Sequence, residues 1–194
     1  MDLKKDFLKE AKKVERAGID DLLEYLDTTD FYTAPASTQY HNSFEGGLVM
    51  HSLSVYDAAK EIADITGLET DKESIILCAL FHDICKANYY VRETRNKKID
   101  GKWHEVEVWS VKDALPMGHG EKSVYILQKY ISLTDEEALA IRWHLGGFDP
   151  GVHFNYPSGY AQKQAFKENK LVALLAGADM IATYLLDSYG EENK

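Results

Sequence analysis

The chain places a histidine and a carboxylate directly after an almost wholly apolar run. Residues 75–81 have the sequence IILCALF, and His82-Asp83 follow at once. A run of this composition predicts a central, buried helix, from about Asp71 to Cys85, rather than a helix on the surface. A charged carboxylate beside an imidazole is costly to bury unless it is paired or bound to a metal. His82 and Asp83 are therefore expected to have partners inside the fold.

Four further potential ligands lie in similarly apolar surroundings. They are His51, His119, His144 and Asp179. A single histidine on an apolar helix face is more often a structural residue than a ligand. Asp179 is the most informative, because it lies in the middle of an apolar helix predicted over 171–187, beside the small residues Gly177 and Ala178. Six such groups can share a core only if something neutralises or coordinates them, and the set therefore predicts a metal centre.

Taken in chain order, these residues resemble the H…HD…H…H…D signature of the HD-domain metal-dependent phosphohydrolases. The resemblance covers about residues 40–187 and implies an HD-type helical fold with one or two divalent ions. As the resemblance implies, His51, His82, Asp83 and Asp179 would hold one ion. His119 and His144 would complete a second site, with Asp83 bridging the two ions.

The segment from His82 to Lys86 also resembles the HDxGK variant of this motif, in which the lysine contacts a phosphate or the region of the nucleophile. We therefore expect Asp83 and Lys86 to be catalytic. A structural role for Lys86 is equally open, because a cation at the C-terminus of a helix complements the helix dipole. Cys85 stands where the variant has glycine. We expect its side chain to be buried packing rather than a ligand.

A narrower resemblance precedes the first histidine of the series. Residues 40–51, which include Gly46-Gly47, resemble the corresponding element of a group of 3′-to-5′ exoribonucleases that end in an HD domain. The two glycines would let the chain pass close to the site before the helix begins.

The ligand set indicates chemistry at phosphorus. Two divalent ions a few ångströms apart generate hydroxide from water at neutral pH and stabilise both the attacking and the leaving oxygen. Nitrogen and oxygen ligands suit Mn, Fe, Mg, Co, Ni or Zn, and the sequence does not choose among them. The candidate substrate-binding residues are Lys86, Arg142 and Asp149, and Asp149 or Glu45 is the candidate for handling protons.

Three functions remain open for this set of residues. The leading one is a metal-dependent phosphohydrolase that uses activated hydroxide to cleave a phosphomonoester or phosphodiester of a nucleotide or short oligonucleotide. The alternative is a mixed-valence diiron oxygenase acting on a small molecule, because some HD-domain proteins with the same series have that activity. The third is a non-catalytic nucleotide-binding module whose metal is structural.

The rest of the chain predicts a single all-α domain, residues 1–194, with one small β-hairpin. An N-terminal helical extension, 1–39, precedes a metal-site core, 40–187. Alternating residues around Asp100-Gly101 predict the hairpin at about 89–112. Residues 146–166 are expected to contain a long loop that forms a lid or an aromatic seal on the core. Further helices are expected at about 3–26 with a break at Gly18, 45–66, 120–132, 135–144 and 167–189.

Charge limits the partners. The chain carries 22 Lys and Arg against 32 Asp and Glu, a net charge of −10. This balance argues against binding to long duplex DNA or to a membrane. It permits a phosphorylated small molecule, a nucleotide or a short single-stranded nucleic acid, because a divalent cation reverses the local charge. A basic patch on the hairpin is either a phosphate funnel or simply solvated, and it consists of Arg92, Arg95, Lys97, Lys98 and Lys102.

The expected compartment is the cytoplasm. The N-terminal residues lack the apolar core of a secretory signal. The longest apolar runs are far shorter than the ~20 residues of a membrane-spanning helix. Cys78 and Cys85 lie on one predicted helix, too far apart for a disulfide. The sequence makes no prediction of oligomeric state.

Overall fold

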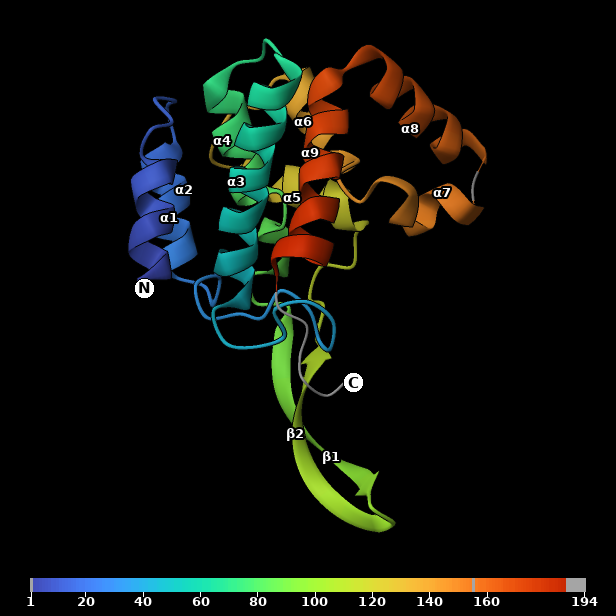
Figure 1. Cartoon of the computed structure of the whole chain (residues 1–194). Helices are drawn as coiled ribbons and strands as arrows, with labels where there is room; N and C mark the ends of the chain where they lie inside the picture. Colours follow the sequence, from blue (N-terminus) through green and yellow to red (C-terminus); the bar gives the residue numbers. More distant parts are fainter. Residues whose placement is uncertain (1, 155, 188–194) are drawn as a thin grey trace.

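The computed structural model describes residues 2–154 and 156–187, and it is predominantly helical (Figure 1). The helices are α1 (Leu3–Ala11), α2 (Ile19–Asp27), α3 (Gly47–Thr66), α4 (Lys72–Phe81), α5 (His119–Leu127), α6 (Asp135–Arg142), α7 (Pro150–Phe154), α8 (Tyr156–Glu168) and α9 (Lys170–Ile181). The 3-10 turns η1 (Ile84–Lys86) and η2 (Gly146–Phe148) and the π-helical turn η3 (Ala182–Leu186) connect or extend them. Strands β1 (Tyr90–Ile99) and β2 (Lys102–Val111) pair in one antiparallel hairpin. The predicted all-α class with one small hairpin is confirmed for the described residues.

Helices α3, α4, α6 and α9 form the centre of the fold, and α3 packs against both α4 and α9 (Figure 1). α4 is the most completely buried of them, because every residue from Ser74 to Phe81 is buried. Leu77 and Leu80 of this helix have no exposed surface. Full burial of such a leucine contributes about 1.5–3 kcal/mol relative to exposure. The polar residues that follow α4 therefore lie inside the core.

α4 ends earlier than the sequence predicts. The helix stops at Phe81 instead of Cys85, and the chain passes through His82-Asp83 into the 3-10 turn η1. Asp83 has left helical geometry, with φ −102° and ψ 18°. Side chains three positions apart eclipse one another in a 3-10 turn. Asp83 and Lys86 consequently lie on the same side of the chain.

The N-terminal segment forms two helices in place of the single one predicted over 3–26. The break falls at Gly18, as expected, and this residue has φ +91°. A Cβ at this position would collide with the backbone carbonyl of Tyr130. Only glycine combines that backbone conformation with so close an approach.

Arg16, in the turn between α1 and α2, ties the N-terminal segment to the centre of the fold. Its guanidinium pairs with the carboxylate of Glu137 in α6 at 2.6 Å and with that of Glu73 in α4 at 2.6 Å. Glu137 has no exposed surface. The proposed division of a single domain, 1–194, into an extension, 1–39, and a core, 40–187, stays a prediction.

The hairpin projects from the helical body (Figure 1). Asp100 and Gly101 connect Ile99 to its partner Lys102, and both turn residues have positive φ, 48° and 80°. A two-residue turn of this kind matches the twist of the strands that it joins. The predicted hairpin at about 89–112 is confirmed.

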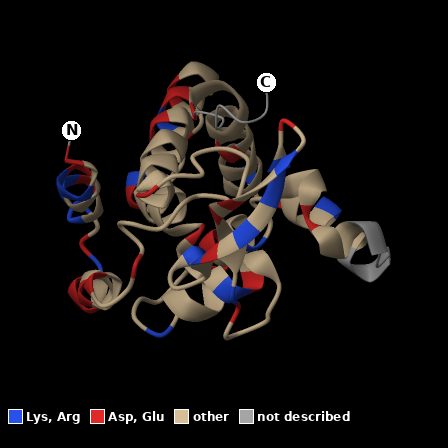
Figure 2. Ribbon diagram, turned by 90° about the horizontal axis from the view of Figure 1, so that it is seen from below, with Lys and Arg blue, Asp and Glu red and all other residues tan. Residues whose placement is uncertain are grey.

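Figure 2 shows Lys and Arg along the hairpin, with acidic residues among them, and both signs of charge on the helices. Part of this basic charge is engaged within the hairpin itself. The Arg92 guanidinium lies 3.9 Å from the centroid of the Trp109 ring, and Arg95 bonds Glu93 at 3.1 Å and Ser110 at 2.7 Å. The role of the patch as a phosphate funnel stays a prediction.

The prediction of a long loop over 146–166 is wrong. The turn η2 and the helices α7 and α8 occupy this stretch. Pro150 is the first residue of α7, a position where the missing N–H of proline leaves no hydrogen bond unmade. Gly146 and Pro150 here begin helical segments instead of interrupting them. Residue 155 and the side chains of 153–158 lie outside the described part of the structure.

Two other helices end before their predicted limits. α5 ends at Leu127, short of residue 132. The helix predicted over 167–189 begins as α9 after Asn169, whose side chain accepts a hydrogen bond from the N–H of Leu171, and widens after Ile181 into η3. Residues after 187 lie outside the described part. Within it, no single helix is long and apolar enough to cross a membrane, although one bent pair, Gly159–Glu168 with Lys170–Leu186, meets the length and composition test together.

Candidate metal centre

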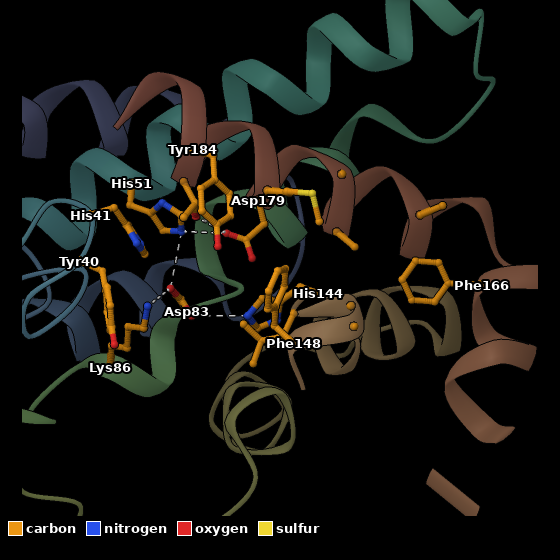
Figure 3. Close-up of a pocket in the computed structure, with 18 residues that line it drawn as sticks. Tyr40, His41, His51, Asp83, Lys86, His144, Phe148, Phe166, Asp179 and Tyr184 are labelled. Atoms are coloured by element: carbon orange, nitrogen blue, oxygen red, sulfur yellow. Dashed lines mark hydrogen bonds and ion pairs between the residues drawn. The ribbon is translucent and has the colours of Figure 1, made fainter. Parts of the chain in front are cut away.

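The structure brings the six predicted ligand side chains together, although they come from distant segments. Figure 3 shows four of them, His51, Asp83, His144 and Asp179. His51 lies in α3, His82 and Asp83 follow α4, His119 begins α5, His144 follows α6, and Asp179 lies in α9. The Nε2 atom of His51 is 3.1 Å from Oδ1 of Asp179 and 3.3 Å from Nε2 of His82. His51, His82, Asp83 and His144 are buried.

The two carboxylate oxygens of Asp83 face different histidines. Oδ1 is 2.6 Å from Nε2 of His119 and 3.6 Å from Nε2 of His144. Oδ2 is 3.6 Å from Nε2 of His82 and 3.7 Å from Nε2 of His51. A carboxylate that bridges two ions requires this kind of arrangement. The assignment of each residue to one of two ions stays a prediction.

Hydrogen bonds on the far side of three imidazole rings direct their Nε2 atoms toward the centre. Nδ1 of His82 and Nδ1 of His144 lie 2.8 Å and 2.6 Å from backbone carbonyls three residues earlier. Nδ1 of His51 lies 2.7 Å from Oδ2 of Asp187. Carbonyl and carboxylate oxygens only accept, so each Nδ1 carries a proton, and Nε2 is the atom that offers a lone pair to an ion when the ring is neutral. Metal-binding histidines are held in this way.

A divalent cation fits these lone pairs. Nε2 of His144 is buried and has no hydrogen-bond partner among the described residues. Such an unpaired buried atom costs about 1–3 kcal/mol. The ligand atoms of His82, His144 and Asp179 lie within 4.8 Å of one another. Bonds of about 2.0–2.2 Å to a common ion would separate ligand atoms by roughly 3–4 Å, so small shifts of these side chains suffice.

The centre opens into a cavity of about 920 Å³. Four candidate ligands and Lys86 lie at one end of it, and Phe166 lies at the other (Figure 3). The lining residues are Tyr40, His41, His51, Asp83, Lys86, His144, Leu145, Gly146, Gly147, Phe148, Phe166, Ala173, Ala176, Gly177, Asp179, Met180, Thr183 and Tyr184. The cavity is thus polar near the histidines and largely apolar along α9.

The family model for the HD domain matches residues 48–179 of this chain. The chain belongs to the HD domain family. The matched range contains all six predicted ligands, from His51 to Asp179. The predicted family membership is therefore confirmed.

A curated relative of this HD domain protein is the dihydroneopterin 2′,3′-cyclic phosphate phosphodiesterase of Methanocaldococcus jannaschii, with 37% identity over 82 residues. The match covers 40% of this chain and 31% of the relative, so it spans less than a third of that protein. No solved structure matches the chain with significance. The family and the relative together support a phosphohydrolase enzyme, whereas the narrower resemblance to exoribonucleases stays a prediction.

Protons and carboxylates balance one another in the metal-free HD domain. Burial alone would lower the pKa of His51, but hydrogen bonds with Asp179 and Asp187 raise it to about 9. Burial would also lower the pKa of His119, but Cys85 and Asp83 raise it to about 10. The pKa of Asp83 is held well below its usual range, because Lys86, His82 and His119 outweigh the effect of burial.

The remaining histidine of the HD dipeptide behaves differently. Burial lowers the pKa of His82 to about 3, so its ring is neutral and ready to bind a cation. Protonated His51 and His119 thus supply positive charge beside the buried carboxylates, and their Nε2 protons must leave when an ion binds.

Lys86 lies in the turn η1 with its ammonium directed into the HD domain centre (Figure 3). Its Nζ is 2.6 Å from Oδ2 of Asp83, and this carboxylate raises the pKa of the lysine well above its ordinary value, against the effect of burial. The lysine therefore contacts a candidate metal ligand and lines the cavity. Its catalytic role stays a prediction.

Arg142 and Asp149 bind each other outside the set of lining residues. The guanidinium of Arg142 is 2.5 Å from the carboxylate of Asp149 and 2.5 Å from that of Glu121. These contacts join α6, α5 and the start of α7. Glu45 is exposed and also does not line the cavity. The substrate and proton-transfer roles of these residues stay predictions.

Two residues at the centre lie outside the predicted ligand set. Asp187 supports His51 from behind, and its second oxygen, Oδ1, is buried without a hydrogen-bond partner among the described residues. His41 packs against His51, with ring centroids 4.8 Å apart, and burial together with His51 lowers its pKa to about 4. One signal for His41 was its place just before Gly46-Gly47, in the element that resembles the exoribonucleases. No pattern in the sequence pointed to Asp187.

Proposed function

We propose that this chain is a metal-dependent phosphohydrolase that cleaves a phosphomonoester or phosphodiester of a small molecule with a flat ring, such as a nucleotide or a pterin. One observation carries the proposal. A single cavity combines a cluster of candidate metal ligands and a lysine at one end with an apolar wall at the other. The phosphate of a substrate could therefore bind near the metal ligands while its ring packs against the apolar wall.

The residues near the metal site would share the work at the phosphate. One or two bound divalent ions would activate water and stabilise the charge on the phosphoryl oxygens. Asp83 would bind both ions, one through each carboxylate oxygen, because its two oxygens face different histidines. Lys86, fixed by Asp83, would offer its ammonium to a non-bridging phosphate oxygen.

The apolar wall supports a substrate with a ring. Ala173, Ala176 and Gly177 of α9 line the cavity with little or no side chain, and Phe166 and Phe148 complete its apolar part. A volume of about 920 Å³ is large enough for a nucleotide-sized ligand, since such pockets commonly measure about 300–1,000 Å³. The curated relative is a phosphodiesterase of dihydroneopterin 2′,3′-cyclic phosphate, which supports the same class of substrate.

The first test is elemental analysis of the purified protein, followed by assays with Mn²⁺, Mg²⁺, Fe²⁺, Co²⁺, Ni²⁺ and Zn²⁺. The substrates are 2′,3′-cyclic nucleotides, dihydroneopterin 2′,3′-cyclic phosphate, nucleoside monophosphates and short single-stranded oligonucleotides. We expect bound metal and ester hydrolysis. Consumption of oxygen by the iron-loaded protein without hydrolysis would instead indicate an oxygenase. Metal binding without any turnover would indicate a binding module.

Variants test the residues within the same assay. Asp83→Ala should lose most of the bound metal and all of the turnover, because both sides of the centre depend on this carboxylate. His119→Ala should chiefly empty one of two sites. Asp64→Asn, an exposed change on α3, is the matched control and should behave like the wild type. Unchanged metal content in both site variants would contradict the assignment.

A further inference from the structure

The thiol of Cys85 lies at the candidate metal centre, and the proposed function does not use it. Cys85 is in the turn η1 and is 2% exposed. Its Sγ atom is 3.3 Å from Nδ1 and 3.8 Å from Nε2 of His119. The N–H of Cys85 donates to the hydroxyl of Ser123 in α5 at 3.3 Å, which joins the turn to the helix that His119 begins. The thiol is therefore held against the imidazole.

Asp83 lies near the thiol as well, and His144 lies near Asp83. Asp83, Cys85 and His119 each offer a ligand atom, and these atoms lie within 4.8 Å of one another. His144 adds an independent observation, because its buried Nε2 has no hydrogen-bond partner among the described residues and lies 3.6 Å from Oδ1 of Asp83. The Asp83 carboxylate thus has the Cys85 sulfur within 4.8 Å and the imidazoles of His119 and His144 within 2.6 Å and 3.6 Å of its Oδ1.

We propose that the Cys85 thiolate binds one metal ion together with Asp83 and His119, with His144 as a further ligand. The inference rests on the proposed metal centre and concerns which atoms form it. Metal–sulfur bonds of about 2.3 Å and metal–nitrogen bonds of about 2.0 Å place sulfur and nitrogen roughly 3–4 Å apart. The observed 3.8 Å between Sγ and Nε2 agrees with this spacing. On binding, the S–H bond breaks, the metal–sulfur bond forms, and the proton passes to solvent.

A thiolate would change the metal preference of this subsite. Nitrogen and oxygen ligands alone accept hard ions such as Mg²⁺ and Mn²⁺, whereas a thiolate favours Zn²⁺, Fe²⁺ and Co²⁺. Glycine, which the HDxGK variant of the motif has at this position, supplies no ligand. The two sides of Asp83 are therefore chemically different in this chain, one with nitrogen and oxygen only and one with sulfur.

Cobalt spectroscopy of the whole chain tests the proposal without any measurement of turnover. A thiolate bound to Co²⁺ gives an intense charge-transfer band in the near ultraviolet, and imidazole and carboxylate ligands do not. We expect this band in the wild type and its loss in Cys85→Ser and Cys85→Ala. The chain has two cysteines. The matched control is Cys78→Ala, because Cys78 is buried in α4, where its Sγ donates to the Glu137 carbonyl at 3.9 Å and is in none of the candidate metal-ligand groups.

Each outcome decides the question. Cobalt bound without the band in the wild type would overturn the thiolate and leave the metal centre standing, whereas no bound cobalt would overturn both. If the Cys85 variants fail to fold, the band in Cys78→Ala still assigns the sulfur, since one thiol then remains. We further expect Cys85→Ser to weaken Zn²⁺ binding by at least about tenfold, a loss typical of removed metal-site contacts, with little change for Mn²⁺. Equal losses for both ions would contradict the proposal.

Discussion

Asp187 provides the sharpest test of how the centre is held. Its carboxylate contacts Nδ1 of His51 at 2.7 Å and does not belong to the family signature. Removing a partner that orients a metal-binding histidine typically weakens metal binding by about 10–100-fold. This range equals about 1.4–2.8 kcal/mol, since a factor of ten is about 1.4 kcal/mol.

Two variants of Asp187 are expected at opposite ends of this range. Asp187→Ala leaves Nδ1 of His51 without its acceptor, and no other hydrogen-bond partner is described for that atom. We therefore expect a loss near the upper limit, about 100-fold. Asp187→Asn keeps an oxygen that accepts the Nδ1 proton and loses only the charge. Its loss is expected near the lower limit, about tenfold.

The pH of the assay separates orientation from general damage. Asp187 helps to raise the pKa of His51 to about 9, so at pH 7 the wild type must release this proton before an ion can bind. The variants hold the proton less strongly, which partly offsets their loss. The loss in affinity for Mn²⁺ or Co²⁺, measured by competition with a chelating indicator, should thus be larger at pH 9 than at pH 7.

Two results would refute this reasoning. One is an affinity of Asp187→Ala within threefold of the wild type at both pH values. The other is an equal loss in Asp64→Asn, a control in which an exposed carboxylate of α3 is removed. Circular dichroism of each variant establishes that the helices are intact.

Three further predictions follow from other contacts. Because His51 and His119 have pKa values raised to about 9 and 10, apparent metal affinity should rise with pH between 7 and 9, by up to about tenfold per unit for each proton released. In the metal-free chain the same protons stabilise the fold below about pH 6.5. Thermal unfolding should show that this stabilisation is lost as the pH rises through 9. Arg16→Ala leaves the fully buried Glu137 without its cation and should reduce the free energy of unfolding in urea by about 3 kcal/mol. A reduction below about 1 kcal/mol, which is typical of exposed ion pairs, would contradict this prediction. Gly177→Leu should raise KM for ring-bearing esters without changing metal affinity. A Cβ at this position meets no atom within 4 Å, so the leucine side chain would extend into the cavity. The control is Gly177→Ala, a small side chain that also favours the helix.

The residues of the candidate site were predictable because a buried charged side chain must be paired with an opposite charge or bound to a metal. His82, Asp83 and Asp179 stand in segments too apolar for solvated surfaces, so their presence required partners. The structure supplies those partners from one another, with His51 3.1 Å from Asp179 and His119 2.6 Å from Asp83. Residue type and apolar context thus predicted that these side chains lie together, while their roles as metal ligands stay a prediction.

Helix ends were less predictable, because the deciding contacts come from distant parts of the chain. α4 was expected to continue to Cys85, yet it ends at Phe81, where the chain turns Asp83 and Lys86 toward one side. The segment after Gly146 contains glycine and proline, which favour a loop locally, and it nevertheless forms α7 and α8. Local propensity is a weak guide where tertiary contacts decide the outcome.

The end of α9 shows why Asp187 escaped prediction. In a continuous α-helix, residues eight positions apart are about 12 Å apart along the axis and about 80° apart around it. Asp179 and Asp187 would then be too far apart to contact the two nitrogens of one imidazole. In the structure they do so, Asp179 at Nε2 and Asp187 at Nδ1 of His51, because α9 widens into the π-helical turn η3 and Asp187 is extended, with ψ 152°. Departures from α-helical geometry of this kind often occur at functional sites. The break after Ile181 is therefore a requirement for two carboxylates of one segment to hold one histidine.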